Sequence, residues 1–113
     1  MKVEGSAKHV TVYVNSNDQW SGKPLYSAII QLCQSQGIAG ASVSRCVEGY
    51  GAGHQLHTAR LLELSENLPM RIDIIDVEER IKVLLPALER MVEEGLLVIA
   101  DVHTIRLLRD PKK

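Results

Sequence analysis

Apolar and polar positions alternate along short stretches of this chain and recur at helical spacing along two longer ones. Residues 9–14 alternate three valines with polar neighbours, and a period of two is typical of a half-buried strand. Strand spacing also predicts strands over residues 41–48 and 70–75, and a last strand over 97–108. Four strands are therefore expected.

Two longer segments place apolar residues three and four positions apart, as the buried face of a helix requires. The first helix is predicted over residues 23–36 and ends at Gly37, a residue suited to a left-handed cap. The second helix starts at Asp76 and closes at Gly95. The Asp76 carboxylate is expected to accept from the first N–H groups while Glu79 reaches back, a variant of the capping box.

The predicted order of elements is strand, helix, strand, strand, helix, strand. This order is typical of an α+β, ferredoxin-like βαββαβ sandwich in which both helices cover one face of an antiparallel sheet. We expect one domain over residues 1–113, with its core over 8–108 and a polar tail over 109–113. The other face mixes apolar and polar side chains, so self-association is expected there. Its residues include Thr11, Tyr13, Ser42, Cys46 and Ile75.

Composition narrows the class of protein without indicating a function. Apolar residues make up 45% of the chain and charged residues 24%, ordinary globular values that argue against a disordered or membrane protein. The formal net charge of -1 comes from interleaved acids and bases, whereas a nucleic-acid binder concentrates Lys and Arg. With no secretion signal or long apolar run, we expect a cytoplasmic protein in which Cys33 and Cys46 are reduced thiols.

A glycine-rich stretch opens the longest irregular segment, which is predicted over residues 49–67. Gly49, Gly51 and Gly53 stand at alternate positions and could turn successive backbone N–H groups toward a phosphate or carboxylate. A purely structural turn explains the same spacing. Within the segment, residues 58–65 are compatible with either a short helix or an extended piece.

Charged side chains around this segment are further candidates. His57 and Arg60 are three residues apart and could pair with an anion, although Arg60 is equally well explained as a surface charge. His54 and His57 have a spacing that could begin a metal site, but no nearby Cys or carboxylate completes a pattern. Arg45 falls on a valine face, so we expect it to meet a ligand or an acid such as Asp73 at a subunit contact.

The sequence offers aromatic candidates but no catalytic ones. Trp20 and Tyr26 flank the start of the first predicted helix, where they either pack in the core or stack on an adenine base. Nothing places a nucleophile against a base, so no catalytic residue is predicted and the chain is not expected to be an enzyme.

Several short motifs occur in an order that matches a known family. They are Trp20-x-Gly22-Lys23-Pro24-Leu25-Tyr26, Gly37-x-Ala39-Gly40-Ala41, Gly49-Tyr50-Gly51-Ala52, His57-Thr58-Ala59-Arg60, Leu64-Ser65-Glu66-Asn67-Leu68-Pro69 and Glu93-Glu94-Gly95-Leu96. Together they resemble the PII-like proteins (GlnB-like superfamily) of the domain-of-unknown-function family 190. The resemblance covers residues 9–108.

The resemblance implies a function as well as a fold. It implies a homotrimer with ligand sites in the clefts between protomers, and a mobile loop over 49–67 that reports the state of the ligand. The expected function is a signalling module that binds a small anionic ligand, an adenine nucleotide, without a required cofactor. The candidate ligand-binding residues are Gly49, Gly51, Gly53, His57, Arg60 and Arg45. A membrane transporter or channel is the expected partner, and a divalent-metal-binding trimer of the same fold class is the alternative function.

One difference between this chain and the nitrogen-regulating PII proteins limits what the resemblance implies. The nitrogen-regulating PII proteins hold nucleotide phosphates with a loop of glycine and lysine between the second helix and the last strand, whereas this chain has the tight turn Glu94-Gly95-Leu96 there. The phosphate-binding mode of those proteins is therefore not expected here. Nor is modification of a loop-tip tyrosine, because Tyr50 lies at the base of the segment.

Overall fold

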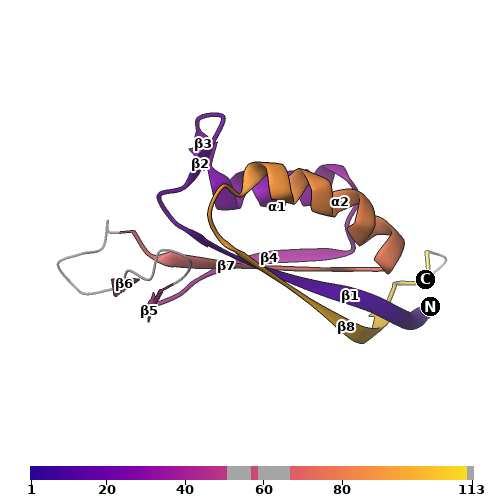
Figure 1. Cartoon of the computed structure of the whole chain (residues 1–113). Coiled ribbons are helices and arrows are strands. Elements are labelled where there is room, and N and C mark those ends of the chain that lie inside the picture. The colour runs from indigo at the N-terminus through magenta and orange to yellow at the C-terminus, as the bar shows by residue number, and fades with distance from the viewer. Residues whose placement is uncertain (51–56, 59–66, 112–113) are drawn as a thin grey trace.

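The computed structural model describes residues 1–50, 57–58 and 67–111. Its main sheet is antiparallel, with the strand order β4-β7-β1-β8. The four strands are β1 (Lys2–Asn15), β4 (Gly40–Arg45), β7 (Pro69–Asp76) and β8 (Leu96–Leu107). Helices α1 (Leu25–Ser35) and α2 (Glu78–Met91) lie side by side on one face of the sheet (Figure 1). The predicted ferredoxin-like sandwich is confirmed.

The core lies between this sheet and the two helices. Alternate residues of β1 and β7 face the helices, and Val10, Val12, Ile72 and Ile74 are fully buried. The helices contribute one apolar side each, with Ile29, Cys33, Ile81, Leu84 and Leu88 among the buried residues. Burying a side chain of this kind contributes about 1.5–3 kcal/mol, so this layer accounts for much of the stability of the fold.

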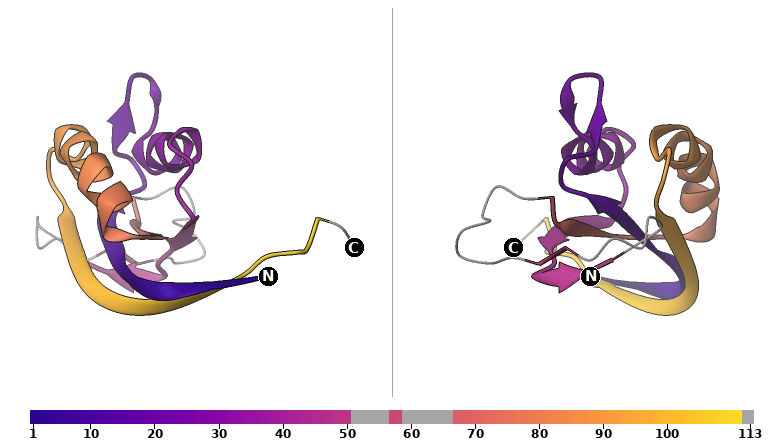
Figure 2. Two further views of the ribbon diagram at one scale, coloured as in Figure 1. Left: turned by 90° about the vertical axis from the view of Figure 1, so that its right-hand side faces the viewer. Right: turned by 60° about the vertical axis from the view of Figure 1, so that its left-hand side comes forward.

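The inner strand β1 is longer than predicted. β1 begins at Lys2 rather than at residue 9, because its first half pairs with the end of β8 from Lys2↔Leu107 onward. This two-stranded ribbon extends beyond the helices and curves away from them (Figure 2). Most of its side chains are exposed there, so they do not follow the alternation that predicts a half-buried strand.

The second predicted strand is shorter than expected. β4 ends at Arg45, where the next N–H group, of Cys46, donates to the carbonyl of Pro69 over 2.9 Å. Residues 48–49 instead form β5 (Glu48–Gly49), which pairs with β6 (His57–Thr58) in a separate two-stranded sheet.

Both helix starts differ from the prediction. α1 begins at Leu25 because Lys23–Pro24 forms β3, which pairs with β2 (Gln19–Trp20) in a hairpin. At the start of α2 the N-cap is Val77, with no side-chain cap hydrogen bond, so the predicted capping box is wrong. Asp76 is buried instead, and its carboxylate accepts from the N–H groups of Val77 at 2.7 Å and Ala39 at 2.9 Å.

Cys33 and Cys46 are free thiols, buried and partly buried respectively. Burial raises the pKa of Cys33 to about 11. Among the described residues, no helix has the length and apolar character needed to cross a bilayer.

Candidate functional site

The two ends of the long predicted loop are fixed at one end of the sheet. Gly49 of β5 lies opposite His57 of β6, so two of the predicted ligand-binding residues are neighbours. A Cβ added to Gly49 would contact the ring of Pro69 at 3.6 Å, which places β5 directly against the start of β7. We call residues 46–49, 57–58 and 67–69 the loop base.

Residues 67–69, the last part of the loop base, are hydrogen-bonded to the turn that follows β1. The N–H of Ser16 donates to the carbonyl of Leu68 at 2.8 Å, and the N–H of Leu68 donates back to Ser16 Oγ at 2.9 Å. The Asn67 side chain accepts from the N–H of Asn17 at 3.0 Å. These bonds give Asn67 and Ser16 an anchoring role that the sequence alone did not indicate. Their only sequence signal was that Asn67 belongs to one of the family motifs.

A polar cluster formed by His9, Thr11, Arg71 and Asp73 lies on the helix-free face. Asp73 is its centre. His9 Nε2 lies 2.8 Å from Asp73 Oδ1, the Thr11 hydroxyl donates to the same oxygen at 3.2 Å, and Arg71 Nε donates to Asp73 Oδ2 at 3.1 Å. The Arg71 guanidinium also lies 6.0 Å from the centre of the Tyr13 ring, within range of a cation–π contact.

Electrostatics keep this cluster charged. Burial would raise the pKa of Asp73, but hydrogen bonds from Arg71, His9 and Thr11 outweigh it and hold the pKa below its usual value. The hydrogen bond to Asp73 raises the pKa of Arg71, with smaller contributions from Tyr13 and Cys46.

Arg71 can also donate hydrogen bonds to groups outside this cluster. Its hydrogen bonds to Asp73 come from Nε, and no described residue accepts from its terminal nitrogens. The sequence placed Arg71 and Asp73 on one strand face but did not give their cross-strand partners. The register supplies these, since Thr11 lies opposite Asp73 and Tyr13 opposite Arg71.

The remaining predicted site residues have different outcomes. Arg45 is exposed at the end of β4, opposite Met70, whereas Asp73 lies on the other face of the sheet. Arg45 and Asp73 therefore do not pair within one chain, because they lie on opposite faces of the sheet. Their expected pairing at a subunit contact stays a prediction. Gly51, Gly53, His54 and Arg60 lie outside the described residues, as does most of the 49–67 segment, and the expectations for them stay predictions.

The two candidate aromatic residues have different environments. Tyr26 packs against the core, whereas Trp20 stands in the β2–β3 hairpin with 39% of its surface exposed. Within the described part of the chain, no group of three or more His, Cys, Asp or Glu side chains could hold a metal ion. His54, one of the two histidines that could begin a metal site, lies outside the described residues, so the metal-binding alternative stays a prediction.

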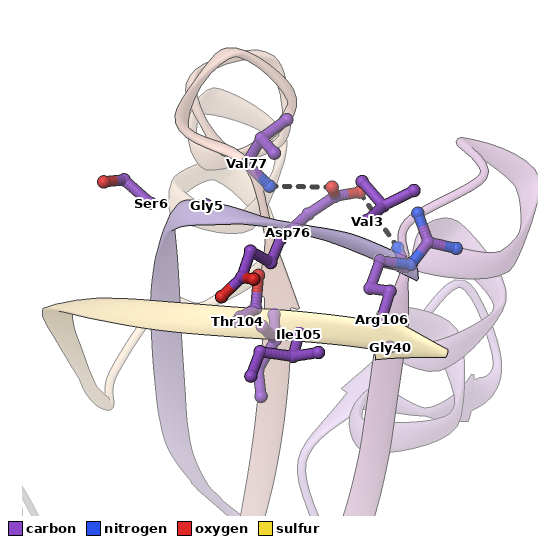
Figure 3. A pocket seen from close by; sticks show the side chains of 12 residues that line it. Val3, Gly5, Ser6, Gly40, Asp76, Val77, Thr104, Ile105 and Arg106 are labelled. Atoms are coloured by element: carbon purple, nitrogen blue, oxygen red, sulfur yellow. Dashed lines mark hydrogen bonds between the residues drawn. The ribbon is translucent and has the colours of Figure 1, made fainter. Parts of the chain in front are cut away.

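A cavity of about 320 Å³ lies at the opposite end of the sheet, between the β1–β8 ribbon and the start of α2 (Figure 3). Val3, Ile75, Val77 and Ile105 give it apolar walls. Asp76 lines it too, but both carboxylate oxygens are occupied by backbone N–H groups. The charged residues of this lining are one cation, Arg106, and two acids, Glu4 and Asp76. Because the acids outnumber the cation, the loop base is the better candidate site for an anionic ligand.

Comparison with known sequences identifies relatives along most of the chain. The family model DUF190, described as "Uncharacterized ACR, COG1993", matches residues 7–104. A UPF0166 protein of Aquifex aeolicus is 31% identical over 100 residues, which cover 88% of this chain and 94% of the relative. A UPF0166 protein of Methanocaldococcus jannaschii is 33% identical over 101 residues, covering 88% and 93%.

Solved structures share the fold at low sequence identity. CPII of Thiomonas intermedia K12, a nitrogen regulatory PII-like protein bound to ADP, AMP and bicarbonate, matches with a TM-score of 0.68 and 15% identity over 90% of this chain and 91% of CPII. The B. subtilis GlnK–ATP complex matches with a TM-score of 0.55 and 9% identity over 86% and 82%. The PII-like fold that the sequence motifs predicted is confirmed.

Proposed function

The chain belongs to the DUF190 family, and from this membership we propose that it is a PII-like signalling module that binds an adenine nucleotide at its loop base. Two proteins of the same fold, CPII and GlnK, hold adenine nucleotides in their solved structures, which supports this ligand class. The proposal assigns a binding and signalling role and no catalytic residue.

The meeting of Gly49 and His57 at the loop base is the observation that carries the proposal. Arg45 ends β4 one residue before this base and is exposed, so its guanidinium can reach a bound anion. In the proposed site, Gly49, Gly51 and Gly53 offer backbone N–H groups to the phosphates. His57, Arg60 and Arg45 offer positive charge through charge-assisted hydrogen bonds.

A homotrimer completes the proposal. The helix-free face carries the half-buried polar cluster and the exposed side chains of Leu96 and Val98 on β8. A second copy covering this face would bury the apolar groups and bring a neighbouring chain to each loop base. Binding between protomers would then couple nucleotide state to the conformation of the 49–67 segment, which we propose contacts a membrane transporter or channel.

Nucleotide binding is tested by isothermal titration calorimetry with ADP, AMP and ATP. Arg60→Ala should weaken binding by about 1.5–3 kcal/mol, the usual range for hydrogen bonds to charged groups, and Gly51→Val should abolish it. Lys82→Ala is the matched control, because Lys82 is an exposed cation of α2 whose nearest acid, Glu78, is 3.8 Å away. Unchanged affinity in both loop variants would place the site elsewhere.

The ligand class and the assembly have separate tests. Differential scanning fluorimetry with nucleotides and with divalent metals should show a raised melting temperature for nucleotides alone. A shift with metals alone would support the metal-binding alternative instead. Light scattering should give three times the chain mass of 12.5 kDa, and a stable monomer at micromolar concentration would contradict the trimer.

A further inference from the structure

A groove of about 520 Å³ lies between α1, α2 and the β2–β3 hairpin, away from the loop base and from the helix-free face. Ala28 and Leu32 of α1 and Met91 of α2 give it an apolar floor, and Trp20, Lys23 and Arg90 stand around it. The hairpin rises from the helix layer on the side away from the sheet (Figures 1 and 2). The groove therefore stays accessible when the helix-free face is covered by other copies.

The hairpin holds Trp20 in a fixed position beside this groove. Ser21 and Gly22 both have positive φ, 50° and 79°, as the two-residue turn of a tight hairpin requires, and Trp20 lies opposite Lys23. Its base is tied by Asp18, which accepts from the N–H of Leu25 at 2.8 Å through its carbonyl oxygen. Trp20 is thus a large apolar side chain that is exposed on an ordered element, the kind of residue that dominates binding energy in protein interfaces.

The charge of the groove has one sign. Among the described residues that line it, Lys23 and Arg90 are the only charged ones, although the chain as a whole has a net charge of -1. Lys23 Nζ donates to Gln31 Oε1 at 2.8 Å, which holds the ammonium group over α1. Arg90 is exposed in the last turn of α2, and no described residue forms a hydrogen bond or ion pair with it.

We propose that this groove binds a short acidic segment of a partner protein. An apolar side chain of the segment would pack on Met91 and against the Trp20 ring, and its carboxylates would pair with Lys23 and Arg90. The combination of an aromatic residue, a methionine and an arginine around an apolar floor is typical of the centre of a protein interface. Lys23 and Arg90, the cations of the lining, favour an acidic partner over a basic one. Three acids, Asp18, Glu93 and Glu94, line the neighbouring pocket beside Met91. The carboxylates of the segment would therefore lie toward Lys23 and Arg90 and away from these acids.

Trp20 is the only tryptophan of the chain, so its fluorescence reports directly on this groove. The probe is a short labelled peptide of alternating Glu and Leu, with the matching peptide of alternating Lys and Leu as its control. The acidic peptide should bind in an anisotropy titration, shift Trp20 emission to shorter wavelength and protect the ring from acrylamide quenching. The basic peptide should do none of these.

Variants show whether the acidic peptide binds in the groove or at another site. The double variant K23Q and R90Q should weaken binding of the acidic peptide by about tenfold or more, the loss expected for charge-assisted hydrogen bonds. Lys82→Gln, which removes a cation of α2 outside the groove, should leave affinity unchanged, and so should Gly51→Val at the proposed nucleotide site. Equal binding of both peptides, equal effects of the Lys82 and groove variants, or binding without a Trp20 response would overturn the proposal.

Discussion

The two faces of the sheet are built from the same strands but differ in how they are held. On the helix-covered face, Val12 of β1 lies opposite Ile72 of β7, and both are fully buried among other aliphatic side chains. On the helix-free face, Thr11 and Asp73 lie directly opposite each other within a hydrogen-bonded polar cluster. The first face needs only apolar side chains of suitable shape, whereas each polar side chain of the second face needs a specific hydrogen-bond partner. We therefore expect the stability of the fold to depend mainly on the first face.

The largest expected effect is on the helix-covered face. Ile72→Ala leaves a cavity in the centre of the core and should lower the free energy of unfolding by about 2–5 kcal/mol. Ile75→Ala, a matched change on the other face of the same strand, should cost much less, because Ile75 is only partly buried. Urea denaturation of both variants measures the difference, and equal losses would show that the two faces contribute alike.

Gly95 lies in the turn before β8, where the chain passes close to the backbone of β1. An added Cβ would stand 2.7 Å from the carbonyl oxygen of Tyr13 and 2.8 Å from Val92 Cγ1, so the backbone has to move. Gly95→Ala should therefore destabilise the fold by about 1–3 kcal/mol. Gly40→Ala is the control, since nothing lies within 4 Å of the position that its added methyl group would take. Thermal denaturation that finds the two variants equally stable would contradict this close approach.

Acid should weaken the polar cluster before it affects the apolar core. The lowered pKa of Asp73 means that the folded state favours its ionised form, so its contribution is present above the ordinary pKa of an aspartate and is lost as the pH falls through the lowered value. Asp73→Asn should remove this part of the acid sensitivity and cost about 1 kcal/mol at neutral pH. Denaturation curves across the acidic range test it. An unchanged pH dependence in the variant would assign the acid sensitivity to other carboxylates.

At neutral pH, ionisation of the two thiols is expected to have the smallest effect on the stability of the fold. Cys33 is 1% exposed and burial raises its pKa to about 11, so it should resist alkylation in the folded protein while Cys46 reacts first. The folded state favours the neutral Cys33 thiol, so stability should fall as the pH rises from about 9 toward 11. Mass spectrometry after iodoacetamide treatment identifies the labelled residue. Preferential labelling of Cys33 would contradict its burial.

The order of elements was predictable because it depends on local periodicity. Alternation in residues 9–14 and 70–75 identified β1 and β7 and the faces of their side chains. It did not give the register, which places Thr11 of β1 opposite Asp73 of β7 in the polar cluster. The sequence also could not show that residues 2–8 continue β1, since their pairing partner lies about a hundred residues away in β8.

The candidate site was predictable only in part, because local motifs do not show which segments pair. The motif around Gly49 and that around His57 were each recognisable, but their pairing as β5 and β6 is a contact between segments. Asp76 does not have the expected capping role, because α2 begins at Glu78 and Asp76 precedes the N-cap. Its carboxylate accepts from the N–H group of Val77 with one oxygen and from that of the distant Ala39 with the other. The local sequence predicts which nearby backbone groups a side chain can bond to, but a backbone group far along the chain can bond to the same side chain.

The pairing of β1 with β8 has a consequence for synthesis of the chain. β1 is an inner strand made from the first residues, yet one of its neighbours is the last strand to be made. Until residues 96–107 have left the ribosome, one edge of β1 has no partner, and an unpaired strand edge is a template for pairing with other chains. A chain truncated before β8 would expose that edge permanently, so such fragments should aggregate rather than accumulate as folded protein.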